Sequence, residues 1–322
     1  MRKFFLLAAT VCTILSSCSE GSEPSIEPTP EPTPTPQEQV KIPINLSIGN
    51  YTRANDTAFE NGDKVGIYVV NYNGSTAGTL ATSGNHVNNT QFTYNGSAWT
   101  PASTIYWLDQ TTHADFYAYY PYSASASISA HSFSVKTDQS TEANYFASDF
   151  LWGKATNIAP IKNAVPITTN HTFSNILIYL EAGEGFTAET FAAATKSVKI
   201  TNIKTSATIN LATGVATATG DIAAITPWNV GTHYRAMVVP QTVADGTNLI
   251  TITIDGVDYT FAKGFTFKPN HQHKFTVSIN KTNGNIDIGI GGWESDDSDN
   301  GGSANDELEN PSDSGNENQW GN

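Results

Sequence analysis

Hydrophobic side chains recur at every second position through much of this chain, and that period constrains the fold more than any other feature. Between residues 40 and 48 the apolar positions are Val40, Ile42, Ile44, Leu46 and Ile48. Because successive side chains of an extended strand point to opposite sides, this period predicts a strand with one apolar face. Pro43 lies on the other face and lacks the amide that a central strand uses for pairing. We therefore expect residues 40–48 to form an edge strand.

Further short strands are predicted along the chain. Asn95-Gly96 and Asp255-Gly256 each separate two apolar runs and predict β-hairpins with two-residue turns. The other expected strands are 65–70, 114–120, 176–180, 197–203, 207–211, 236–239, 274–279 and 285–290, and the one expected helix is 187–196. Many short strands predict an all-β protein built of sandwiches. The region is long for one sandwich, so we expect two domains, 40–165 and 166–293, divided in a loop that holds Pro160 and Pro166.

The two flanking segments are too polar to form a core. The alternating Pro, Thr and Glu residues after position 18 predict a stiff tether over 18–39, about 60 Å long at about 3.1 Å per residue. Residues 294–322 carry nine acidic and no basic side chains and predict a disordered acidic tail. The formal charge of −14 belongs mostly to these flanks, since residues 40–293 carry only −2. A nearly neutral fold without a basic stripe argues against a nucleic-acid partner.

The N-terminus resembles the signal peptide of a bacterial lipoprotein. A charged start precedes an apolar run, Phe4 to Leu15, that is too short to span a bilayer as a mature helix. The run ends in Leu15-Ser16-Ser17-Cys18, which resembles a lipobox. The resemblance implies that residues 1–17 are removed and that Cys18 carries several acyl chains, which together anchor a protein stably to a membrane. The alternative is an ordinary secretory signal that contains a cysteine.

Cysteine usage bears on how the mature protein is stabilised. The second cysteine, Cys12, lies within the segment expected to be removed. No disulfide is then possible in the mature chain, and burial of apolar side chains must stabilise the fold.

The sequence offers no catalytic or cofactor motif, so we expect neither an enzyme nor a cofactor. A Gly-x-Ser-x-Gly elbow, a Walker loop and His-Glu-x-x-His are all missing from the sequence. His271 and His273 would share one face of a strand, but no third metal ligand stands at a suitable spacing. Aromatic residues cluster at Trp107, Phe116, Tyr117, Tyr119, Tyr120 and Tyr122. They either fill a core or stack on sugar rings.

An ordered set of short phrases resembles the fimbrillin family of Bacteroidales, the Mfa-like subunits of type V pili. The phrases are Arg53-Ala54, Phe59 to Tyr68, Ile105-Tyr106-Trp107, Asp115 to Pro121, Asp149 to Gly153, His171 to Leu180, Val239-Pro240-Gln241 and Trp293. The resemblance covers residues 40–293 and implies two tandem transthyretin-like β-sandwich domains. It also implies an outer-membrane lipoprotein that assembles with other fimbrial subunits as a shaft, anchor or tip.

The same resemblance implies a processing step. In the family an arginine-specific, trypsin-like protease cleaves near this position, and a strand from the next subunit fills the opened groove by β-augmentation. Arg53 is the matching residue, so cleavage between Arg53 and Ala54 would remove the pro-strand of Val40, Ile42, Ile44, Leu46 and Ile48. A surface arginine in a loop is the alternative. The candidate donor strand alternates Ile286, Ile288 and Ile290 near the C-terminus.

Two functions remain in view. The first is a structural subunit of a cell-surface fimbria that serves adhesion. Because of the acidic tail, the position of this subunit in the filament stays open. The alternative is a monomeric surface lipoprotein of the outer membrane that binds a glycan or a host protein. Asp56-Thr57-Ala58 resembles an O-glycosylation acceptor and would place a glycan on Thr57.

Overall fold

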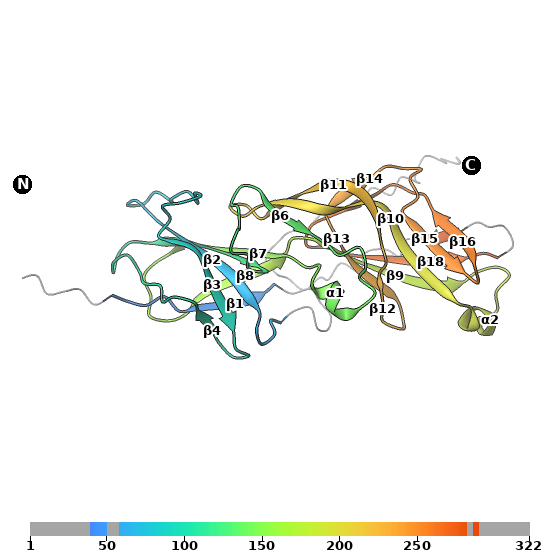
Figure 1. The fold of residues 1–322 in the computed structure, drawn as a ribbon, viewed down its shortest axis with the longest axis horizontal. Coiled ribbons are helices and arrows are strands. Elements are labelled where there is room, and N and C mark those ends of the chain that lie inside the picture. Colours follow the sequence, from blue (N-terminus) through green and yellow to red (C-terminus); the bar gives the residue numbers. More distant parts are fainter. Residues whose placement is uncertain (1–38, 50–57, 282–285, 290–322) are drawn as a thin grey trace, which may run out of the picture. The chain divides into compact units, whose positions relative to one another are not determined.

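The computed structural model describes residues 39–49, 58–281 and 286–289, and in these residues the chain is an all-β protein (Figure 1). The strands are β1 Ile44–Ile48, β2 Lys64–Asn71, β3 Val87–Tyr94, β4 Trp99–Pro101, β5 Ala114–Tyr120, β6 His131–Ser134, β7 Leu151–Ile158, β8 Val165–His171, β9 Ser174–Ala182, β10 Lys196–Asn210, β11 Val215–Ile225, β12 Trp228–Asn229, β13 Tyr234–Val238, β14 Gln241–Val243, β15 Ile250–Ile254, β16 Val257–Phe261, β17 Phe265–Phe267, β18 Gln272–Ile279 and β19 Ile286–Gly289. Two short helices, α1 Glu142–Phe146 and α2 Ala188–Ala193, interrupt them. Neither helix is long and apolar enough to cross a bilayer.

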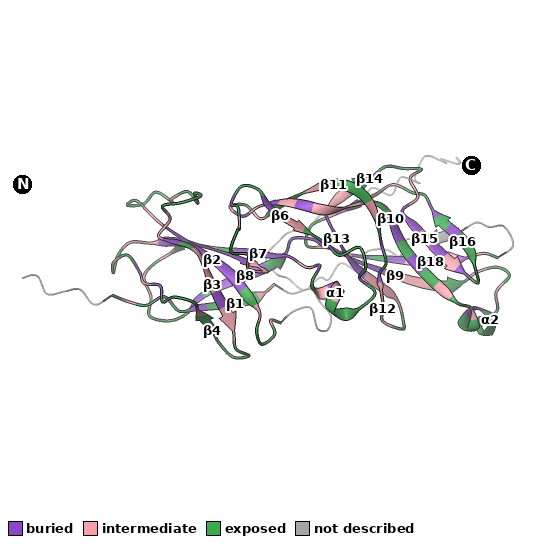
Figure 2. Cartoon of the chain, viewed as in Figure 1, coloured by how far each residue is buried: buried purple, intermediate pink, exposed green. Residues whose placement is uncertain are grey.

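The first sheet has seven strands in the order β1-β8-β7-β5-β2-β3-β4. Its middle strands are buried on both faces, as the near-continuous apolar sequences of β2 and β5 require. Alternate residues of β5 enter different cores: Phe116 joins the cluster that includes β1, whereas Tyr117 and Tyr119 join a larger cluster with the C-terminal strands. Figure 2 shows the buried residues concentrated on the strands, while α2 and most loops are exposed.

The C-terminal strands form two five-stranded sheets and a small pair. One sheet runs β11-β10-β15-β16, with β6 paired to β10, and the other runs β12-β13-β9-β18-β19, while β14 pairs with β17. Their apolar faces meet in the larger core, which contains Ile176, Ile200, Ile252 and Phe275. The predicted period of two is confirmed here: β18 buries His273, Phe275, Val277 and Ile279 and leaves the residues between them partly exposed.

The loop predicted around Pro166 is wrong, because Pro166 lies inside strand β8. This strand buries Val165, Ile167, Thr169 and His171 and exposes the residues between them. β7 pairs with β8 only at Thr169–His171, so no β7 carbonyl needs a hydrogen bond from the backbone amide of residue 166. A proline, which lacks that amide, is therefore tolerated there. The proposed domain limit at 165/166 therefore falls at the start of a strand of the first sheet, and the division into two tandem domains stays a prediction.

Other element predictions need correction. Residues 197–203 and 207–211 belong to one long strand, β10, whose pairing with β11 shifts register twice. Its first part also pairs with β15 and its last part with β6, so β10 has three partner strands. The predicted helix ends at Ala193 instead of residue 196, because Lys196 already starts β10. Helix α1 was not predicted, since five residues are too few to display a helical period.

Both predicted hairpins form, but only one has a two-residue turn. At Asp255-Gly256 the flanking residues Ile254 and Val257 pair directly, and both turn residues have positive φ, as a type I′ turn requires. Around Asn95-Gly96 the paired residues are Tyr94 and Trp99, which leaves a four-residue loop. The Asn95 side chain accepts hydrogen bonds from the amides of Ser97 and Ala98 and so favours this longer loop.

Candidate edge-strand site

The candidate site is the N-terminal edge strand β1 and the slot that it occupies. β1 is at one end of the seven-stranded sheet, as its sequence predicts, and pairs in parallel with β8 (Figure 1). The register places Ile44 opposite Val165 and Leu46 opposite Ile167. The Val165 amide donates to the Pro43 carbonyl at 2.8 Å, and the Gly49 amide donates to the Thr169 carbonyl at 2.6 Å. Backbone hydrogen bonds thus hold both ends of the strand.

The residues that precede β1 pair with a different segment. The Ile42 amide donates to the Ile105 carbonyl at 3.0 Å, and the Trp107 amide donates to the Val40 carbonyl at 2.9 Å. Lys41 and Tyr106 form an antiparallel bridge between these two bonds. The segment 40–48 therefore bridges two walls, Ile105–Trp107 along its first half and β8 along its second.

Apolar burial adds to this pairing. Ile42, Ile44 and Leu46 are 3%, 5% and 6% exposed, whereas Val40 and Ile48 are only half-buried. Full burial of such a side chain is worth about 1.5–3 kcal/mol, so these three contribute about 5–9 kcal/mol. Their neighbours include Trp107, whose Nε1 donates to the Ile161 carbonyl at 3.0 Å, and Ile167. Removing residues 40–48 would expose a slot with two unpaired backbone edges and an apolar floor.

The candidate donor strand lies at the edge of another sheet. Residues Ile286 and Ile288 belong to β19, which pairs antiparallel with β18 from Ile279 to Thr276. Nothing pairs with the other side of β19 among the described residues, since β19 ends its sheet. Ile290 lies outside the described residues.

Several predicted positions also lie outside the described part of the chain. They are the lipidation residue Cys18, the processing residues Arg53 and Ala54, the acceptor Thr57, and the acidic tail.

The histidine pair does not assemble a metal site in the part of the chain that the structure describes. The rings of His271 and His273 stack at 6.1 Å, so they share one face as the strand period predicts. His273 is buried, and its Nε2 accepts a hydrogen bond from the Lys268 amide at 3.1 Å. Burial lowers the pKa of His273 to about 3, which keeps the ring neutral. Within the described ranges, no group of three or more His, Cys, Asp or Glu side chains could hold a metal ion.

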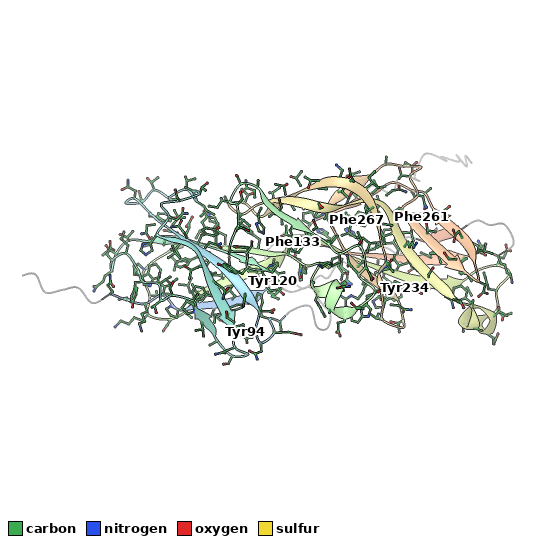
Figure 3. The ribbon with its side chains drawn as sticks, in the orientation of Figure 1. Tyr94, Tyr120, Phe133, Tyr234, Phe261 and Phe267 are labelled. Carbon is green, nitrogen blue, oxygen red and sulfur yellow. The ribbon has the colours of Figure 1, made fainter. Side chains whose placement is uncertain are left out.

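Most of the aromatic cluster serves the core. Trp107, Phe116, Tyr117 and Tyr119 are each at most 5% exposed, which excludes them from stacking on a sugar at the surface. The Tyr119 hydroxyl donates to Asn89 Oδ1 at 2.7 Å, and burial raises the pKa of this phenol. Tyr120, labelled in Figure 3, is only half-buried and pairs with Leu151 of β7 at the end of β5.

Sequence reasoning missed the two walls of the slot. β8 escaped notice because threonine and histidine share its buried face with Val165 and Ile167, which weakens the hydrophobic alternation. The alternation of Val165 and Ile167 with Pro166, Thr168 and Asn170 was the available signal. Ile105–Trp107 carries no strand period at all, since it makes only an isolated bridge.

Comparison with known proteins agrees with this architecture. The sequence profile of the fimbrillin-like family matches residues 52–293. A Bacteroides uniformis protein described as a candidate fimbrium subunit, Fim1C, is 28% identical over 310 residues, covering 91% of this chain and 96% of the relative. A crystal structure of a candidate cell adhesion protein from Bacteroides uniformis superposes with a TM-score of 0.58 at 24% identity, covering 78% of this chain and 95% of the other. One from Bacteroides ovatus gives 0.60 at 16% identity, covering 79% and 96%.

Proposed function

Because the chain belongs to the fimbrillin-like family, a family of structural proteins and not of enzymes, we propose that it is a subunit of a cell-surface fimbria that assembles with other fimbrial subunits and serves adhesion. The family match covers the whole of the described β-structure from β2 onward. The related Fim1C protein, described as a candidate fimbrium subunit, aligns over nearly its full length.

The proposed means of assembly is donor-strand exchange. One observation carries this proposal: segment 40–48 is an edge segment that pairs with two separate walls and buries three side chains. Loss of the segment would open a continuous slot, and a strand supplied by a neighbouring subunit could restore both the backbone pairing and the apolar contacts. The energy of about 5–9 kcal/mol estimated for the buried face is large enough to favour capture of a new strand.

The donor proposed is the C-terminal segment of the next subunit. Ile286, Ile288 and Ile290 repeat the alternation of Ile42, Ile44 and Leu46. Within one chain the segment forms only four residue pairs with β18, so its release would break few hydrogen bonds. The acidic tail that follows would then lie beyond the filled slot. Whether this subunit is a shaft, an anchor or a tip would depend on whether the interface with the next subunit has room for that tail.

The proposal includes a route from the membrane to the filament. Cys18 would carry the lipid that holds the precursor on the outer membrane. Cleavage after Arg53 by an arginine-specific protease would release the lipid, the tether and the pro-strand together, because all three precede the cut. A glycan on Thr57 would then lie close to the new N-terminus at Ala54.

Limited digestion tests the proposal directly. Trypsin should convert the folded chain into a fragment that starts at Ala54, and size-exclusion chromatography with light scattering should then report oligomers. Arg53→Ala should prevent both cleavage and assembly. Arg53→Lys is the matched control, because trypsin still cuts it whereas an arginine-specific protease does not.

The opposite result has a clear meaning. An Ala54 fragment that remains a stable monomer at high concentration would rule out strand exchange for this chain. The monomeric surface lipoprotein that binds a glycan or host protein would then be the better account.

A further inference from the structure

A pocket of about 280 Å³ is lined by α1 and by one face of the sheet that contains β9 and β13, and it also reaches Ile48 at the end of β1. Asn175, Leu177 and Tyr179 alternate along β9 and so share that face. Across the strand pair, Met237 stands opposite Asn175 and Arg235 stands opposite Leu177. The other face of the same strands is mostly apolar, with Ile176, Ile178, Ala236 and Val238 in the core. The face that lines the pocket therefore carries more of the polar side chains of these two strands, among them Asn175 and Arg235.

Two buried acceptors on the pocket wall have no partner among the described residues. Asn175 is 8% exposed, and its Oδ1 makes no hydrogen bond. Asp149 binds His171 through Oδ2 at 2.8 Å, whereas its Oδ1 is buried without a partner. A buried acceptor is unfavourable unless something donates to it. Both atoms therefore call for a ligand that carries hydrogen-bond donors.

The other residues that line the pocket restrict the charge of the ligand. The Arg235 guanidinium lies 4.3 Å from the centre of the Tyr145 ring and donates to its hydroxyl, so the cation is held at the wall. Glu60 and Asp63 add two carboxylates to the lining, which also includes Phe59 and Tyr120. A cationic ligand would meet Arg235, and an anionic ligand would meet three carboxylates. A neutral molecule rich in hydroxyl groups avoids both penalties.

Aromatic rims and mixed donors and acceptors suit a sugar ring, which has apolar faces and a polar edge. The volume lies near the lower limit for ligand pockets and fits about one ring. We propose that this pocket binds a neutral saccharide residue, with Asn175 and Asp149 accepting hydrogen bonds from its hydroxyl groups. Arg235, on the same sheet face as Asn175, donates to the sugar oxygens, and Phe59 and Tyr120 cover an apolar face of the ring.

Saturation-transfer NMR on the full chain tests this proposal. The probes are glucose, galactose, mannose, fucose and N-acetylglucosamine at about 10 mM, which detects dissociation constants into the millimolar range. At least one sugar should receive saturation, and Asn175→Leu, which keeps the branched shape but removes the acceptor, should weaken its binding at least tenfold. Asn163→Leu is the matched control on an exposed loop and should leave binding unchanged.

Three results would overturn the proposal: no sugar binds, Asn175→Leu binds as well as the parent, or Nα-acetyl-lysine amide binds in place of the sugars. If Asn175→Leu fails to fold, Asp149→Asn keeps the side-chain size and must weaken binding instead. None of these results bears on strand exchange, which the digestion experiment tests separately.

Discussion

The packing of a single residue, Leu46, explains how β1 is attached to the rest of the fold. Its side chain is buried opposite Ile167, and truncation would leave a cavity in the core that includes Trp107. We predict that Leu46→Ala lowers the free energy of unfolding by about 2–5 kcal/mol, as measured by urea denaturation. Asn45→Ala, on the exposed face of the same strand, should change it by less than about 0.5 kcal/mol. Equal effects would mean that the apolar face of β1 contributes little.

We predict that His273 makes the stability of the fold sensitive to acid. Because burial puts its folded pKa near 3, below the value of about 6.5 for an unfolded chain, protons bind the unfolded state more tightly between these values. Stability from the neutral ring is thus complete above about pH 6.5 and falls as pH drops toward 3, by at most about 1.4 kcal/mol per pH unit. His273→Gln should flatten this slope in urea titrations between pH 7 and 4, taken relative to the same variant at pH 8. An unchanged slope would show that His273 is accessible to protons in the folded state.

At the scale of elements, the contact between β7 and β8 depends on Gly153. A Cβ at this position would lie 2.2 Å from the Thr168 carbonyl oxygen, so alanine forces the two strands apart. We predict that Gly153→Ala destabilises the protein by about 1–3 kcal/mol in thermal or urea unfolding. Thr156→Ala, at an exposed position of the same strand, is the control and should have little effect. Wild-type stability in Gly153→Ala would mean that β8 is not held as closely as described.

Elements with a regular hydrophobic period could be predicted from the sequence. Elements that lack such a period could not. The alternation of Ile42, Ile44 and Leu46 was enough to predict an edge strand, and Asp255-Gly256 was enough to predict its hairpin. β11 escaped prediction because its alanine and threonine residues provide almost no contrast in hydrophobicity. α1 is too short for a period, and the joining of two predicted strands into β10 depends on different neighbours along its length.

The two sites differ in how far sequence could predict them. The proposed pro-strand is a continuous segment, so its pattern is visible in sequence. Its walls and the proposed saccharide pocket come from segments far apart in the chain, such as Asp149, Asn175 and Arg235, which only the sheet topology brings together. A pocket of this kind leaves no local motif.

For the whole molecule, stability should not depend on disulfides or metal ions. Cys12 lies in the expected signal peptide, and the described residues contain no metal-binding cluster. The melting temperature of the mature chain should therefore be the same with and without reductant or EDTA. A fall of several degrees with EDTA would point first to His271 and His273.

Attachment to the membrane should depend on one residue. Cys18→Ala should release the protein from the outer membrane and abolish labelling with palmitate, as followed by cell fractionation. Cys12→Ala is the matched control and should leave both unchanged. Continued membrane association and labelling of Cys18→Ala would refute the lipoprotein assignment.

Hydrogen exchange at β8 tests strand exchange most directly. Three species would be compared by mass spectrometry: the intact chain, a monomer that starts at Ala54 and ends at Asn285, and the assembled Ala54 form. The Val165 amide, which donates to the Pro43 carbonyl at 2.8 Å, reports whether the slot is occupied. Strand exchange predicts slow exchange across β8 in the intact chain, fast exchange in the trimmed monomer, and slow exchange again after assembly. Fast exchange across β8 in the assembled form would contradict it, because the slot would then remain empty.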